Sequence, residues 1–301
     1  MSASAQELFS FSFLKIAPFE RTHELAKHKA CTQYILSPFF SSIPMNLSKT
    51  VAFVTGAGQG LGRATALRLA SQGAKVIVCD ISREHAQSVV DQIGSGNAFA
   101  AVADVTSVEQ VKSSMDEAVK RWGHINTAVN CAGIIYSGRT YTTKKGPMDL
   151  DKFMNVLRVN VGGSFNVIRL ASEKMSSNTP DEEGQRGVIV NTASIAAMEG
   201  QIGQAAYSAS KGAIVGMTLP IARDLAMFGI RVCTIAPGLF ATPMLAGLPD
   251  DARNALCANV PFPKRLGKPE EYAKLVQQII ENPMLNGEII RLDGALRMQP
   301  Q

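Results

Sequence analysis

The sequence predicts one α/β domain built as a doubly wound parallel sheet, with helices covering both faces. Two observations predict it. From residue 50 onward, short apolar runs alternate with longer stretches in which apolar residues recur with helical periodicity. The short runs are almost continuously apolar, as strands are when both faces of a parallel sheet are covered.

The predicted elements alternate in order along the chain. The predicted strands are Val51–Thr55, Lys75–Cys79, Ala98–Val102, Thr127–Asn130, Val188–Thr192, Arg231–Ile235 and Glu288–Leu292. The clearest predicted helices are Leu61–Gln72, Val108–Arg121, Leu150–Ser176, Ala205–Phe228 and Pro269–Glu281. No repeat or low-complexity linker divides this region, so residues 46–301 are predicted to form a single domain.

Composition narrows the class of protein. The chain has 301 residues, of which 46% are hydrophobic, enough for one large core. No apolar run reaches the ~18 residues of a membrane span. The five cysteines show no C-x-x-C spacing, which favours free thiols in a reducing compartment over disulfides or zinc. The net charge of +5 comes from scattered residues, so no direct nucleic-acid binding is expected.

Residues 1–45 differ from the rest of the chain. They are rich in Phe and Ser and lack clear periodicity. Their lysines and arginines suit a mitochondrial presequence, whereas Glu7, Glu20 and Glu24 do not. Met45 opens a segment that could itself be a protein start. The extension is predicted to lie outside the fold, and the residues leave open whether it is a targeting segment, a disordered tail or the product of a mis-set start codon.

A glycine-rich turn follows the first strand and leads straight into a helix. It reads T-G-A-G-Q-G-L-G, with glycines at Gly56, Gly60 and Gly62. Glycines let the backbone come close to a pyrophosphate, and the free N–H groups of the helix start then bind the anion. The spacing differs from G-x-G-x-x-G, and glycines also serve simple tight turns. The strand–turn–helix context favours a Rossmann-like dinucleotide site.

Asp80 ends the second predicted strand, where an acid is expected in such a site. A carboxylate there accepts hydrogen bonds from the adenine-side ribose and repels a 2′-phosphate, so NAD is favoured over NADP. Arg63 and Arg83 are near in sequence and soften this preference. The alternative is an ordinary solvated aspartate at a strand end.

The proton chemistry is expected to come from a tyrosine. The four histidines lie in the extension or at surface positions, no G-x-S-x-G elbow occurs, and no His/Asp/Glu cluster has metal-ligand spacing, so no metal is expected. Tyr207 and Lys211 are four residues apart on a predicted helix and share one face. A neighbouring ammonium stabilises the phenolate and lowers a tyrosine pKa from about 10.

Several motifs occur in a characteristic order. They are the glycine turn, N-C-A-G at Asn130–Gly133, Asn160, Ser194, Tyr207-x-x-x-Lys211 and Pro237-Gly238. With these motifs the chain resembles the short-chain dehydrogenases over roughly residues 46–300. The resemblance implies that Ser194 polarises the substrate oxygen and Tyr207 exchanges the hydroxyl proton. Lys211 would bind the nicotinamide ribose and lower the pKa of Tyr207, and Asn160 would hold a water that links Lys211 to solvent.

The resemblance also implies the cofactor contacts. The expected NAD-binding residues are Gly56, Gln59, Gly60, Leu61, Gly62, Asp80, Asp104, Val105, Cys131, Gly133, Tyr207, Lys211, Pro237, Phe240 and Thr242. Cys131 stands where the family usually has asparagine, a change that a backbone contact tolerates. Ser194, Tyr207 and Gln201 are the expected substrate contacts.

Other segments narrow the resemblance within the family. They include Lys144–Gly146, Gly184–Ser194, Gly200–Lys211, Thr218–Ala226, Ile235–Pro243 and Asn286–Ala295. They are similar to members that oxidise 3-hydroxyacyl-CoA in the mitochondrial matrix and also accept hydroxysteroids. The resemblance implies a homotetramer built through the long helices and the C-terminal strand. The alternatives are a 3-oxoacyl carrier-protein reductase, a scaffold subunit in mitochondrial tRNA processing, and a cytoplasmic location.

Two segments are expected to border the substrate. Lys144 and Lys145 lie in a polar loop, residues 138–149, and either contact CoA phosphates or are simply solvated. Residues 239–262 combine large apolar side chains with prolines and small residues. This composition suits a lid over an acyl chain or steroid, although packing or a subunit contact explains it nearly as well.

Overall fold

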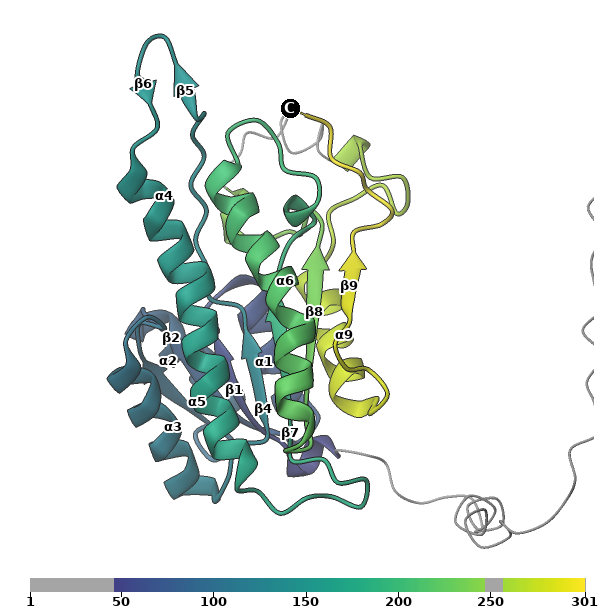
Figure 1. The fold of residues 1–301 in the computed structure, drawn as a ribbon. Helices are drawn as coiled ribbons and strands as arrows, with labels where there is room; N and C mark the ends of the chain where they lie inside the picture. Colours follow the sequence, from purple (N-terminus) through teal and green to yellow (C-terminus); the bar gives the residue numbers. More distant parts are fainter. Residues whose placement is uncertain (1–45, 247–256, 301) are drawn as a thin grey trace, which may run out of the picture. The chain divides into compact units, whose positions relative to one another are not determined.

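The computed structural model describes residues 46–246 and 257–300, and these form one seven-stranded parallel sheet. The strand order is β3-β2-β1-β4-β7-β8-β9 (Figure 1). The strands are β1 (Val51–Thr55), β2 (Lys75–Asp80), β3 (Ala98–Val102), β4 (Thr127–Asn130), β7 (Gly187–Thr192), β8 (Ile230–Pro237) and β9 (Ile289–Leu292). The predicted doubly wound fold is confirmed, with strand ends shifted by at most two residues. The prediction for residues 1–45 lies outside the described residues.

Helices cover both faces of the sheet (Figure 1). One apolar core joins the sheet to α1 (Gly60–Ser71), α2 (Arg83–Ile93) and α9 (Pro269–Glu281). The other joins it to α3 (Val108–Trp122), α5 (Ser164–Ser176) and α6 (Ala205–Ala226). Because strand side chains alternate, Ala52 and Val54 enter the first core while Val51 and Phe53 enter the second. This is why the strands are apolar throughout, and α2 adds a helix to those predicted.

The long helix predicted over residues 150–176 is interrupted. It consists of α4 (Leu150–Leu157), a π-helical segment, Arg158–Gly163, and then α5. Glycines disfavour a regular α-helix, and this segment contains Gly162 and Gly163. A side chain at position 163 would clash with Val105, so the glycine allows close packing there. π-Segments are frequent at functional sites, and this one carries Asn160.

The segment predicted as a polar loop, residues 138–149, contains a small hairpin. Its strands are β5 (Tyr141–Thr142) and β6 (Gly146–Pro147), paired antiparallel. The hairpin rises beyond the start of α4, past the carboxyl end of the sheet (Figure 1). Such short strands have no apolar pattern of their own, which explains why the sequence did not predict them.

A buried arginine fixes α9 against the sheet. Arg231 in β8 is 5% exposed, and its guanidinium donates hydrogen bonds of 2.8–2.9 Å to the carbonyls of Ile279, Ile280 and Leu285. These carbonyls lie at and just beyond the last turn of α9, where a cation also complements the helix dipole. No helix in residues 46–246 and 257–300 is long and apolar enough to cross a membrane.

Candidate active site

The predicted site residues gather at the carboxyl edge of the sheet, around the junction of β1 and β4. The chain runs from β1 outward to β3 and then returns to β4 on the other side, so the strand order reverses here. Ligands of doubly wound sheets bind in the crevice outside such a reversal. The turns that follow the two strands meet, since a Cβ on Gly56 would lie 2.9 Å from the backbone of Ala132.

The glycine turn is shaped for close backbone contacts. Gly56 has a φ of 59°, which favours glycine, and a side chain on Gly62 would overlap the carbonyl oxygen of Gly56. The turn thus folds tightly onto the first residues of α1. Gln59 caps that helix and is exposed, while Leu61 packs at the edge of the first core. The free N–H groups at the start of α1 can therefore bind a phosphate.

Asp80 joins the end of β2 to the glycine turn. One carboxylate oxygen accepts a hydrogen bond from Gly58 N (2.9 Å) and the other accepts one from Ser82 N (3.0 Å). The negative charge is therefore held beside the turn, where the adenine-side ribose of a dinucleotide lies in such folds.

The next strand supplies Asp104 and Val105. The Asp104 carboxylate accepts two bonds of 2.8 Å from Thr106, one from its N–H and one from its hydroxyl. Val105 is buried, and its carbonyl accepts 2.9 Å from Asn166 Nδ2. Both residues therefore have fixed positions at the carboxyl edge beyond β3.

Lys211 is buried within the site. Its side chain is 6% exposed, and its ammonium donates a 2.8 Å hydrogen bond to the carbonyl oxygen of Thr192 at the end of β7. Its Nζ lies 5.6 Å from the centroid of the Tyr207 ring. Burial lowers the pKa of Lys211 to about 8, against a smaller opposite effect of Cys131. The lysine can thus change its charge near neutral pH.

Tyr207 shares its α6 face with Lys211, as the spacing predicts, but its acidity differs from expectation. Burial raises the pKa of Tyr207 above its ordinary value, and a hydrogen bond with Ser194 opposes this. The predicted lowering by Lys211 is not found, since the only group that opposes burial is Ser194. Ser194 caps a short 3-10 turn, and its Oγ accepts 3.2 Å from Ala196 N.

Asn160 connects the loop after β4 to α6. Its Oδ1 accepts 2.8 Å from Ile134 N, and its Nδ2 donates 2.9 Å both to Ile134 O and to Ser210 Oγ. Both ends of the side-chain amide are therefore bonded within the protein, and the Asn160 main-chain carbonyl accepts 2.7 Å from Ser164 Oγ. The expected water contact stays a prediction. A Cβ on Gly133 would lie 3.1 Å from Asn160 Oδ1 and 3.7 Å from Lys211 Nζ. The structure thus brings these three predicted residues together.

Cys131 is held through its backbone, as the departure from asparagine requires. The N–H groups of Cys131 and Ala132 both donate 3.1 Å to Thr55 Oγ1. Thr55 and Thr192 were not predicted as site residues. Both are threonines ending apolar strands, a signal that the sequence contained but that is too common to single them out.

The segment after β8 reaches the glycine turn. Pro237 ends β8, and Phe240 is buried against Gly267. A Cβ on Gly60 would lie 3.5 Å from Thr242 Cγ2, so Thr242 sits beside the turn. The cofactor contacts expected of Phe240 and Thr242 stay predictions. Residues 247–256 of the expected lid lie outside the described residues.

Gln201 is hydrogen-bonded to the C-terminal segment, and its expected substrate contact stays a prediction. Its Nε2 donates 3.0 Å to the carbonyl of Gln299, and its Oε1 accepts 3.4 Å from Gln204. The C-terminal segment occupies this amide, a contact between residues nearly a hundred positions apart that no local pattern predicts. Glu199 makes the same connection, because its carboxylate binds Arg291 (2.8 Å) and accepts 3.0 Å from Met298 N.

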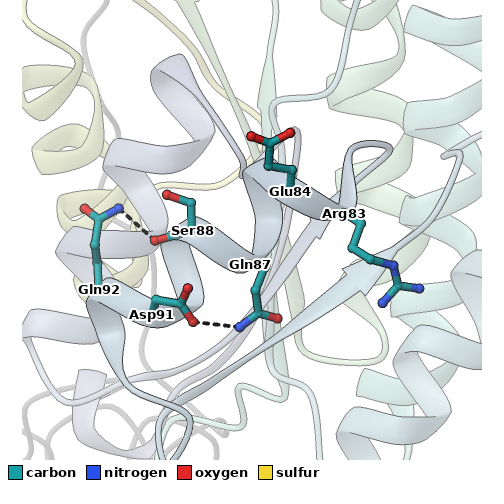
Figure 2. A pocket seen from close by; sticks show the side chains of 6 residues that line it. All are labelled: Arg83, Glu84, Gln87, Ser88, Asp91 and Gln92. Carbon is teal, nitrogen blue, oxygen red and sulfur yellow. Dashed lines mark hydrogen bonds between the residues drawn. The ribbon is translucent and has the colours of Figure 1, made fainter.

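A shallow pocket elsewhere on the surface is not part of this site. It lies on the outer face of α2 (Figure 2), and all its lining residues come from that helix: Arg83, Glu84, Gln87, Ser88, Asp91 and Gln92. Within the helix, Gln87 donates to Asp91 and Gln92 donates to the carbonyl of Ser88. The other end of the Gln92 amide accepts 2.7 Å from the guanidinium of Arg63 in α1. None of the predicted site residues lines it.

Comparisons with known proteins agree with this geometry. The family model for short chain dehydrogenase matches residues 50–253. The chain is 58% identical over 251 residues to 3-hydroxyacyl-CoA dehydrogenase type-2 of Rattus norvegicus, covering 83% of this chain and 96% of that one. For the Drosophila melanogaster protein of that name the identity is 54%, covering 84% and 100%. The crystal structure of 3-hydroxyacyl-CoA dehydrogenase type-2 from Mycobacterium avium superposes with a TM-score of 0.81 at 38% identity, covering 85% and 98%.

Proposed function

Because the chain belongs to the short-chain dehydrogenase family, we propose that it oxidises 3-hydroxyacyl-CoA to 3-oxoacyl-CoA with NAD. The observation that carries the proposal is the meeting of Ser194, Tyr207 and Lys211 beside a glycine turn closed by Asp80. The proposal is also supported by the relatives named 3-hydroxyacyl-CoA dehydrogenase type-2, which this chain matches over nearly their whole length.

The reaction removes a hydride and a proton from a carbinol. The nicotinamide, when bound, supplies the hydride acceptor. Ser194 donates a hydrogen bond to the substrate oxygen and fixes its position. Tyr207 in its phenolate form takes the hydroxyl proton as general base. Lys211 stabilises that phenolate when its ammonium is charged, and Asn160 keeps α6 at a fixed distance from the loop after β4.

The pKa values give oxidation a pH dependence. Burial raises the pKa of Tyr207, so the base form becomes more abundant as pH rises. Burial lowers the pKa of Lys211 to about 8, so its charge, taken alone, is lost at lower pH than the phenolate of Tyr207 forms, although each of these charges stabilises the other. The two groups titrate as a pair, and the oxidation rate is expected to rise with apparent pKa values that belong to both.

The cofactor preference rests on Asp80. Its carboxylate lies beside the glycine turn, where it would repel a 2′-phosphate. We therefore assign NAD as the cofactor. This also argues against a carrier-protein reductase working with NADP.

The test is NADH formation by the purified full-length chain given a 3-hydroxyacyl-CoA. Parallel reactions contain NADP in place of NAD, or a hydroxysteroid in place of the thioester. NAD-linked turnover of the thioester, at least 100-fold faster than with NADP, is expected. No turnover of the thioester while NADH still binds would overturn the substrate and leave the cofactor site standing.

Assembly and location are further parts of the proposal. A homotetramer is supported by apolar side chains exposed along α4, α5 and α6, which include Leu150, Met154, Phe165 and Leu219. Light scattering of the purified protein tests it. The mitochondrial matrix is proposed from the similarity to relatives, and imaging of a tagged full-length chain tests that location.

A further inference from the structure

Thr192 accepts the hydrogen bond of the Lys211 ammonium through its carbonyl oxygen. Its side-chain hydroxyl belongs to a second set of hydrogen bonds. Its Oγ1 donates 2.6 Å to the carbonyl of Asn130 and lies 2.7 Å from the hydroxyl of Tyr272 in α9. The Tyr272 hydroxyl in turn lies 3.7 Å from Cys131 Sγ. Tyr272 itself is fully buried.

The direction of these hydrogen bonds follows from the available protons. The single hydroxyl hydrogen of Thr192 is used by Asn130, at the shortest distance, so Tyr272 must be the donor to Thr192. Cys131 Sγ lies 3.7 Å from the Tyr272 hydroxyl and 3.6 Å from Thr192 Oγ1, so it borders both groups. Burial and the nearby thiol raise the pKa of Tyr272 well above its ordinary value, so its donor hydrogen is retained at every pH of interest. The hydrogen bonds therefore run in one direction, from Tyr272 through Thr192 to Asn130.

Thr192 is a junction between the two helical layers. Lys211 approaches its carbonyl from α6, and Tyr272 approaches its hydroxyl from α9, whose core residues pack on the opposite face of the sheet. Arg231 holds the end of α9 against β8, so Tyr272 approaches from a fixed helix. The orientation of Thr192 is thus set from behind the sheet.

We infer that Tyr272 is a positioning residue for the dehydrogenase reaction, acting through Thr192 on the Lys211 ammonium. This rests on the proposed role of Lys211. With Tyr272 in place, Thr192 is held by both its hydroxyl and its backbone, and its carbonyl stays directed at Lys211. Without the phenol hydroxyl, that acceptor loosens and the charged lysine loses part of its stabilisation. The phenolate of Tyr207 is then less well supported.

The groups that can influence Lys211 come from three elements. Tyr207 lies on α6, Cys131 follows β4, and Tyr272 lies on α9 beyond Thr192. A change in Tyr272 therefore has a specific signature. The pH profile of oxidation moves toward higher pH by about half to one unit, because the phenolate of Tyr207 forms less readily. Turnover at neutral pH falls by up to about tenfold and is recovered at high pH.

The experiment compares Tyr272→Phe with Thr218→Val in the full-length enzyme. Tyr272→Phe keeps the buried ring and removes only the hydroxyl. Thr218→Val removes a hydroxyl that is equally buried and bonded to Thr234 (2.6 Å), on the same helix as Lys211 but away from Thr192. Both variants are expected to lose similar stability, whereas only Tyr272→Phe shifts the pH profile. Thr192→Val should shift it in the same direction, and adding Tyr272→Phe to it should change little more.

The outcomes separate this inference from the proposed function. A shift in Tyr272→Phe that is absent in Thr218→Val supports the positioning role. An unchanged profile in Tyr272→Phe, with Lys211→Met inactive, overturns the role of Tyr272 alone. Substantial activity in Lys211→Met overturns the role of Lys211, and with it the inference.

Discussion

Two regions of the site are built in different ways. The half expected to bind the cofactor, formed by the turns after β1, β2, β3 and β4, brings backbone segments into close contact, as at Gly56 and Ala132, with side chains such as Asp80 bracing them. The half expected to bind the substrate, residues 194–204 with 289–300, is held mainly by side chains that meet across the sequence, as in Glu199–Arg291. Where backbone segments touch, an added side-chain atom forces the backbone to move. Where side chains make the contacts, a substitution removes one contact and lowers stability by a smaller amount.

The largest difference is expected from Gly62→Ala in the cofactor half. The new methyl group would overlap the Gly56 carbonyl, so the turn must move. Overpacking costs ~1–3 kcal/mol of stability, and the displaced turn is expected to lose NADH binding. Thermal unfolding and NADH fluorescence titration measure both. Gly96→Ala is the control, since a Cβ there has open space. NADH binding close to wild type in Gly62→Ala would show that cofactor binding does not depend on the close backbone contact in this turn.

Lys211→Met is expected to separate activity from stability. Turnover should fall about 1000-fold, because a proton-transfer group loses its support. Burial lowers the pKa of Lys211 from 10.5 to about 8. The buried ammonium therefore lowers the free energy of unfolding, and this effect is at its full size below pH 8. That cost disappears as pH rises toward 10.5. The variant should therefore melt above wild type at pH 7, with the difference vanishing near pH 10. A lower melting temperature at pH 7 contradicts this account.

Glu199→Gln probes the substrate half and should leave the cofactor half unchanged. The substitution weakens the contacts of residue 199 with Arg291 and Met298. Because a hydrogen bond to a charged group is lost, we expect KM for the acyl-CoA to rise roughly fivefold. NADH affinity should stay constant. Glu117→Gln, which breaks the exposed pair with Arg121, is the matched control. A change in NADH affinity would mean that the two halves are coupled.

The same carboxylate gives this half a pH dependence. Burial alone raises the pKa of Glu199, but the hydrogen bonds from Arg291 and Met298 outweigh it, so the net pKa is lowered. The contacts of Glu199 with Arg291 and Met298 are therefore stable above the ordinary glutamate pKa and are lost as pH falls through the lowered value. The protection of the amides of residues 296–299 against hydrogen exchange, corrected for the intrinsic exchange rate at each pH, should fall in acid. Equal protection across that range would exclude the contact as the cause.

The smallest effect is expected at the hairpin. Replacing Lys144 and Lys145 by Ala removes two charges from its turn, which rises past the carboxyl end of the sheet. If they contact CoA phosphates, KM for the acyl-CoA rises about threefold at low salt, as exposed ion pairs contribute little. A hydroxysteroid substrate, without phosphates, is the control. Equal effects on both substrates would favour the solvated-loop interpretation.

The sequence predicts the features that depend on local spacing and misses those that depend on contacts between distant residues. The strands, the glycine turn, Asp80 and the Tyr207–Lys211 pair depend on local spacing, and the structure places them as expected. The π-segment at Asn160 was missed because it depends on packing with the distant Val105. The hairpin was missed because its two-residue strands have no apolar pattern. Thr192 and Tyr272 are ordinary core residues in sequence, and only the fold shows their hydrogen bonds to the site. The engagement of Gln201 by Gln299 is equally non-local.

The most direct test is turnover of 3-hydroxyacyl-CoA with NAD by the full-length chain and by Tyr207→Phe, with the NADH dissociation constant measured for both. The substitution removes the hydroxyl that exchanges the proton and keeps the ring. We predict NAD-linked turnover by the wild type, a loss of about 1000-fold or more in the variant, and NADH affinity within about twofold. Turnover near wild type in Tyr207→Phe would contradict the assignment of this site as a tyrosine-based dehydrogenase centre.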